Sequence, residues 1–159
     1  MDFVFDDGGR SEAGYRGKTG DCVTRSIAIA TGRPYQEVYD ALNDLGKSER
    51  TGKRKKRKSN SRTGVFRRSY QRYLEGLGWN WTSTMAIGSG CTVHLRKSEL
   101  PAGRLMVKVS KHLTAVIDGI IHDTHDCSRG GTRCVYGYFH HASNGLKGMS
   151  TNGGGEGRE

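Results

Sequence analysis

Residues 111–126 carry the pattern of a β-hairpin, and this stretch constrains the fold more than any other part of the sequence. Two runs rich in β-branched residues flank Asp118-Gly119, a dipeptide that is strongly favoured in two-residue hairpin turns. Such a turn fixes the register of the two strands. Because side chains alternate along a strand, His112 and Asp123 are then diagonal neighbours on one face of the hairpin, within hydrogen-bonding reach.

A histidine that is held by a carboxylate supplies half of a catalytic device, and the other half is a nucleophile. Asp21 is a favourable N-cap, and Cys22–Thr31 is predicted to form a helix that ends at Gly32. Cys22 would then be the first residue of that helix. Unpaired backbone N–H groups and the helix dipole stabilise a thiolate at this position.

These residues together predict a Cys-His-Asp triad. Cys22 would be the nucleophile, His112 the base, and Asp123 the residue that fixes the tautomer of His112 and supports its charged form. His125 lies on the same predicted face of the hairpin and is the competing base. The alternative for Cys22 is an inert packing role between helix and sheet, because free cysteines are commonly buried.

The order of the predicted elements indicates an α+β fold, with N-terminal helices packed on a C-terminal antiparallel β-sheet. Residues 1–141 are expected to form a single domain, and the glycine-rich tail, 142–159, is expected to be disordered. Periodicity predicts helices at 22–31, 34–45 and 65–77. Strands are predicted at 79–85, 92–95, 104–109 and 135–140 besides the hairpin 111–126, with a further short strand possible at 3–5.

The net charge of +10 is concentrated in one segment. Lys47–Arg72 contains twelve Lys or Arg and one Glu, so the other 133 residues carry a net charge of −1. Residues 47–63 are therefore interpreted as an exposed, mobile basic insertion. It could remain solvated, bind the phosphates of a nucleic acid, or dock an acidic protein. The candidate binding residues are Lys53, Arg54, Lys55, Lys56, Arg57 and Lys58.

The compartment and the metal content follow from absences in the sequence. No apolar run approaches the ~20 residues that cross a bilayer, and the acidic N-terminus does not resemble a signal peptide. Without a C-x-x-C pair, the four cysteines are expected to be reduced thiols in a cytoplasmic protein, in the host cytoplasm if the protein is viral. Neither a metal nor a cofactor is expected, since the spacing of Cys127, Cys134, His140 and His141 fits no common zinc module.

The segments Gly20-Asp21-Cys22 and His112–Asp123 resemble the papain-like cysteine peptidase superfamily, and in particular its small bacterial and phage C39-like members. The resemblance implies a cysteine on the first core helix, a histidine at a strand start, and an acidic or amide residue on the next strand. In this family a Gln several residues before the cysteine usually donates to the oxyanion. Arg16 stands six residues before the cysteine here, so Arg16, Lys18 and Thr19 are the substitute candidates.

Three functions agree with these patterns. The favoured function is a thiol hydrolase, a cysteine peptidase or isopeptidase that acts on a peptide or protein substrate. The alternative is a basic nucleic-acid-binding protein on a peptidase-like scaffold whose triad is unused. A transferase with the same thioester intermediate is the third.

Overall fold

The computed structural model describes residues 1–17, 19–54 and 56–143. Lys18, Lys55 and most of the predicted glycine-rich tail lie outside this range. The helices are α1 (Cys22–Thr31), α2 (Tyr35–Lys47) and α3 (Arg67–Gly76), with one short 3-10 helix, η1 (Lys97–Glu99). The strands are β1 (Asp2–Phe5), β2 (Trp79–Ser83), β3 (Arg104–Val109), β4 (His112–Ile117), β5 (Ile120–Asp123) and β6 (Gly137–His141).

The six strands form one mixed sheet in the order β1-β5-β4-β3-β6-β2. The α+β class is confirmed, but the prediction of a purely antiparallel sheet is wrong, because β1 pairs with β5 in parallel. β1 also precedes the helices in the chain, whereas all other strands follow them. This pairing joins residues about 120 positions apart, and a local sequence pattern carries no signal for it.

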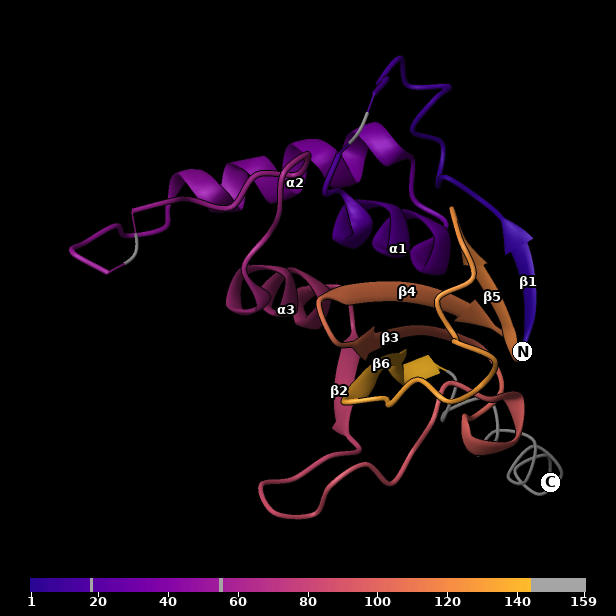
Figure 1. Ribbon diagram of the computed structural model, residues 1–159. Coiled ribbons are helices and arrows are strands. Elements are labelled where there is room, and N and C mark those ends of the chain that lie inside the picture. Colours follow the sequence, from indigo (N-terminus) through magenta and orange to yellow (C-terminus); the bar gives the residue numbers. More distant parts are fainter. Residues whose placement is uncertain (18, 55, 144–159) are drawn as a thin grey trace, which may run out of the picture.

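The three helices cover one face of the sheet, as Figure 1 shows. The core on this face is built around α1, where Ile27 and Ala28 pack with Leu42 of α2, Leu74 of α3 and Ala115 of β4. A smaller cluster on the opposite face includes Leu95, Leu105, Val116 and Val135. Within the part of the chain that the structure describes, no helix combines the length and apolar character needed to cross a membrane.

The central hairpin is confirmed. β4 and β5 pair in the predicted register, with Ile117 opposite Ile120. Asp118 and Gly119 both have positive φ, 49° and 79°, as a type I′ turn requires. The hairpin therefore delivers His112 and Asp123 to the same end of the sheet.

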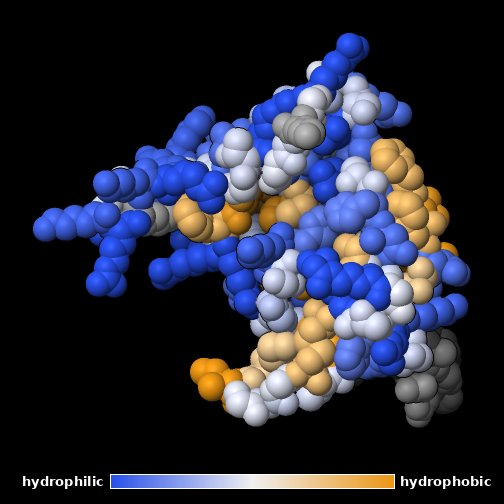
Figure 2. All heavy atoms as spheres, viewed as in Figure 1, coloured by the Kyte–Doolittle hydropathy of each residue, from blue (hydrophilic) through white to orange (hydrophobic). Residues whose placement is uncertain are grey.

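The basic insertion differs from its prediction at its C-terminal end. Ser59 and Ser61 are buried, and the Ser61 carbonyl accepts a hydrogen bond from Thr24 Oγ1 at 2.8 Å. The Ser61 N–H donates to Asn43 Oδ1 at 2.8 Å, which ties the segment to α2. The described lysines and arginines between 53 and 58 are exposed, and Figures 1 and 2 show this part of the chain projecting from the body of the molecule.

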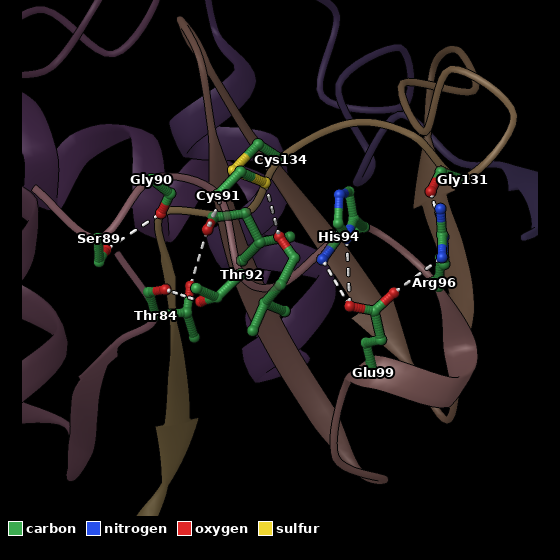
Figure 3. Close-up of a disulfide and its surroundings, with 12 residues drawn as sticks. Thr84, Ser89, Gly90, Cys91, Thr92, His94, Arg96, Glu99, Gly131 and Cys134 are labelled. Atoms are coloured by element: carbon green, nitrogen blue, oxygen red, sulfur yellow. Dashed lines mark hydrogen bonds and ion pairs between the residues drawn. A yellow bond between two sulfur atoms is a disulfide. The ribbon is translucent and has the colours of Figure 1, made fainter. Parts of the chain in front are cut away.

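The expectation of four reduced thiols is wrong, because Cys91 and Cys134 form a disulfide (Figure 3). An isolated β-bridge between His94 and Cys134 brings the two segments together, with Cα atoms of the cysteines 5.8 Å apart. Residues 92–95, predicted as a strand, contribute only this bridge. The disulfide removes Cys134 as a zinc ligand, and it weakens the inference of a reducing compartment.

Candidate active site

The N-terminus of α1 places Cys22 beside the start of β4, where His112 and Leu113 lie. The helix begins at Cys22 and ends at Gly32, whose φ of 74° closes it in the left-handed conformation, as predicted. Cys22 is a free cysteine of intermediate exposure. Asp21 is the N-cap residue of this helix, as predicted, but its carboxylate makes no capping hydrogen bond.

The histidine and the aspartate meet as predicted. Nε2 of His112 lies 2.6 Å from Oδ2 of Asp123. Thr114 Oγ1 donates to the same carboxylate oxygen at 2.7 Å, and the Thr124 N–H donates to Oδ1 at 2.7 Å. Asp123 is 3% exposed, so its carboxylate is held in one orientation by these donors. Nδ1 is the ring nitrogen of His112 that this contact leaves free.

The thiol of Cys22 lies within hydrogen-bonding range of the His112 side chain. Burial raises the pKa of the Cys22 thiol, but the hydrogen bond with His112, its positive charge, the Leu113 N–H and Arg25 together lower it below its usual value. A free cysteine beside an imidazolium at a helix N-terminus is a thiolate over a wider pH range than an isolated thiol. The structure therefore brings all three predicted triad residues together.

The pKa of the His112 imidazole is raised, and the pKa of the Asp123 carboxylate is lowered. Burial alone would lower the pKa of His112, but hydrogen bonds to Asp123, Cys127 and Cys22 raise it to about 11. Burial would raise the pKa of Asp123, but its hydrogen bonds with His112 and Thr114 lower it to about 2. The site thus favours a thiolate, an imidazolium and a carboxylate at neutral pH.

A buried charge network behind the triad has no counterpart in the sequence predictions. Arg25 is 7% exposed and pairs with Asp21 at 2.5 Å and with Asp123 at 3.4 Å. Tyr35 donates to the second Asp21 oxygen at 2.7 Å, and Arg10 lies 3.6 Å from the first. The i, i+4 spacing of Asp21 and Arg25 was the only signal in the sequence, and it is equally typical of an exposed helix.

Two further residues lie beside His112. Cys127, predicted to be a loop cysteine, is a free thiol that is 2% exposed and lies close enough to His112 to help raise its pKa. The exposed His125, predicted as the competing base, has its ring centroid 5.0 Å from that of His112. His112, Asp123 and His125 have potential metal-ligand atoms within 4.8 Å of one another, but Asp123 is already occupied by its hydrogen bonds.

The predicted oxyanion candidates are not joined to Cys22 by a contact among the described residues. Thr19 Oγ1 accepts a 3.5 Å hydrogen bond from Arg10, and the Arg16 carbonyl accepts one from Arg62. Lys18 lies outside the described residues. A residue that the sequence did not indicate, Tyr70 of α3, is close enough to the Cys22 sulfur for a thiolate there to raise its pKa, although burial is the larger cause of its rise to about 12.

The site is a cysteine, a histidine and an aspartate, presented by one helix and one hairpin of an α+β protein. Comparison with family models, curated proteins and solved structures finds no match to this chain. The function is therefore argued from the geometry of the site itself.

Proposed function

We propose that this protein is a thiol hydrolase that cleaves a peptide or isopeptide bond with Cys22, His112 and Asp123. The observation that carries the proposal is that His112 is hydrogen-bonded to the Asp123 carboxylate through Nε2 and lies close enough to Cys22 to lower the pKa of its thiol. A nucleophile, a base, and a group that orients the base are the three parts that covalent catalysis of acyl transfer needs. Cys22 is partly exposed rather than fully buried, as a nucleophile that meets a substrate must be.

The arrangement of elements supports a papain-like version of this chemistry. The nucleophile opens the helix that packs along β4, the base opens β4 itself, and the orienting carboxylate ends β5. This is the order and placement that the resemblance to papain-like peptidases implies. The proposal concerns the positions of these three residues, and it is compatible with a mixed sheet in which β1 is parallel.

The first half of the reaction forms a thioester. The Cys22 thiolate attacks the carbonyl carbon, and the electron pair of the carbonyl moves to its oxygen. The electron pair on that oxygen then re-forms the C=O bond as the C–N bond breaks, and the His112 imidazolium gives its proton to the leaving nitrogen, so the amine departs neutral and a thioester remains on Cys22. Asp123 keeps its negative charge throughout and stabilises the imidazolium.

The second half of the reaction releases the acyl group. His112, now neutral, removes a proton from a water molecule as the oxygen attacks the thioester. The C–S bond breaks, and the thiolate and imidazolium are restored. An amine in place of water would make the protein a transferase with the same residues.

Two donors near Cys22 are suited to the developing oxyanion. The Cys22 N–H belongs to the first helical residue and so has no partner within the helix. Burial raises the pKa of the Tyr70 hydroxyl, so the hydroxyl stays protonated at neutral pH and can donate a hydrogen bond. We propose this pair in place of the Gln that papain-like peptidases use.

The proposal is tested with libraries of fluorogenic peptide and isopeptide substrates, scored for hydrolysis by the wild type. Cys22→Ala should abolish hydrolysis, while Cys91→Ala/Cys134→Ala should retain most of it, because these two cysteines form a disulfide that contacts no triad residue in the described part of the chain. A trapped acyl group on Cys22, seen by mass spectrometry after acid quenching, is the expected intermediate. Hydrolysis that survives in Cys22→Ala would overturn the proposal.

A second candidate function is nucleic-acid binding by the basic insertion, with the triad unused. The observation that favours it is that Lys53, Arg54 and Lys56 are exposed and pair with no carboxylate among the described residues. The guanidinium carbon of Arg57 lies 5.3 Å from the centroid of the Phe66 ring, and Lys58 Nζ donates to the Lys47 carbonyl at 3.1 Å. These contacts do not neutralise the charge of either cation. Clustered unpaired cations attract phosphates.

The two candidates separate cleanly in a binding titration. Nucleic-acid binding through the insertion should weaken steeply with salt and be lost when residues 53–58 are changed to Gln. It should also be indifferent to Cys22→Ala. Binding that persists after the charges are removed would exclude this function for the insertion.

A further inference from the structure

Lys108 of β3 stands beside the nucleophile on the helix-covered face of the sheet. Its register partner on β4 is Leu113, whose side chain packs in the helix-facing core and whose N–H lies within hydrogen-bonding range of the Cys22 sulfur. Partners in an antiparallel pair point to the same face, so Lys108 is one strand away from the thiol. The ammonium is half-buried and lies close enough to Cys22 for their charges to interact.

A second cation is held on the same side of the site by an aromatic ring. The guanidinium carbon of Arg67, the first residue of α3, lies 4.0 Å from the centroid of the Trp81 ring. That ring lies against Gly137 of β6, where an added Cβ atom would overlap the indole. Gly137 is in turn the register partner of Lys108. The stack of Arg67, Trp81 and Gly137 thus ends next to Lys108.

These two cations have no carboxylate partner in the described part of the chain. Burial lowers the pKa of Lys108; a thiolate at Cys22 opposes this, while Arg67 and Arg133 lower it further. Arg133 is committed elsewhere, since its Nη2 donates to the Ser110 carbonyl at 2.5 Å. Like charges placed together without a counter-ion cost free energy, and a bound carboxylate would remove that cost.

We propose that Lys108 and Arg67 form a carboxylate-binding subsite beside Cys22, which selects substrates with an Asp or Glu next to the bond that is cleaved. The inference rests on the proposed hydrolase function and names its substrate class. The ammonium supplies a point charge that is already partly desolvated, and the stacked guanidinium supplies a fork for a carboxylate. Arg67 is exposed, which keeps the subsite open on the solvent side.

The test compares two alkylating reagents that differ in charge. Rates of Cys22 labelling by iodoacetate and by iodoacetamide are measured by mass spectrometry. Both reagents react with the thiolate, so the ratio of the iodoacetate rate to the iodoacetamide rate does not depend on the fraction of Cys22 that is ionised. The ratio should exceed that of N-acetylcysteine by roughly fivefold in the wild type. It should fall by at least about threefold in Lys108→Met and in Arg67→Gln. The control Arg72→Gln makes the same charge change at an exposed position of α3 and should leave the ratio unchanged.

A second pair of probes tests the acidic side chain directly. Two peptide chloromethyl ketones, identical except for Asp or Asn before the ketone, are compared on the same variants. The Asp probe should react faster with the wild type, and Lys108→Met should remove this preference. If Cys22 reacts as an activated thiolate but neither preference changes in the variants, the subsite is wrong and the hydrolase proposal stands. If Cys22 is not activated, both proposals fail.

Discussion

Nε2 of His112 lies 2.6 Å from Oδ2 of Asp123, and this single contact determines which ring nitrogen faces the nucleophile. The carboxylate is fixed by Thr114 and by the Thr124 N–H, so it cannot follow the ring if the ring turns. The imidazole is therefore held with Nδ1 turned away from Asp123, and the thiols of both Cys22 and Cys127 lie close enough to the ring to raise its pKa. Several measurable properties depend on this relationship.

Asp123→Asn should reduce the reactivity of Cys22 at mildly acidic pH. The amide can still accept a hydrogen bond from His112, but the negative charge that raises the pKa of His112 is lost. We expect alkylation of Cys22 at pH 6 to slow by on the order of tenfold. Asp126→Asn is the matched control, because this exposed carboxylate bonds to Ser128. Equal rates in the two variants would show that Asp123 does not tune the pair.

Acid should destabilise the protein through Asp123. Its pKa is about 2 in the folded state against an ordinary 3.8, so its stabilising contribution is complete above pH 4 and is lost as the pH falls towards 2. The free energy of unfolding should therefore fall by on the order of 2 kcal/mol more in the wild type than in Asp123→Asn across this window. Urea titrations at pH 5, 4, 3 and 2 measure the difference, and parallel curves for the two proteins would contradict it.

Arg25→Met should destabilise the fold far more than Arg33→Met. Both arginines pair with an acid at i, i+4 spacing, but Arg25 serves the buried Asp21, whereas Arg33 and Glu37 are exposed. Removing one partner of a buried pair costs about 3–5 kcal/mol, and removing an exposed pair costs about 0.5 kcal/mol. Chemical denaturation measures both, and a similar loss in the two variants would mean that the network is solvated in solution.

Removal of the disulfide should lower stability without changing the nucleophile. Cys91 and Cys134 close a loop with a sequence separation of 43, for which a loss of about 3–4 kcal/mol is expected on reduction. A reductant should lower the midpoint of thermal unfolding of the wild type and leave a Cys91→Ala/Cys134→Ala variant unaffected. If the reductant does not change the midpoint of thermal unfolding of the wild type, the two thiols are unpaired in solution.

The parts of this structure that were predictable from sequence are those set by local physics. The turn at Asp118-Gly119 fixes the hairpin register, and the glycine after Thr31 fixes the end of α1. The register of the hairpin predicts the meeting of His112 with Asp123. The N-cap residue Asp21 predicts that the helix begins at Cys22.

The remainder depends on contacts between distant segments. The parallel pairing of β1 with β5 and the Cys91–Cys134 disulfide have no local signature. Lys108 likewise has no local signature. Its position near Cys22 follows from the place of β3 between β4 and β6 in the sheet. Asp21 is the N-cap residue that its side chain type favours, but its carboxylate pairs with the buried Arg25 instead of capping the helix, and this depends on tertiary packing.

The most direct test of the central claim is the rate of iodoacetamide labelling of Cys22 against pH, resolved by mass spectrometry. The buried Cys127 is the internal reference, and His112→Ala is the comparison variant. The account predicts rapid labelling of Cys22 well below the ordinary thiol pKa of about 8.5, and loss of this reactivity in His112→Ala. Labelling of Cys22 that follows an ordinary thiol profile in both proteins would contradict the thiolate–imidazolium pair and the hydrolase function built on it.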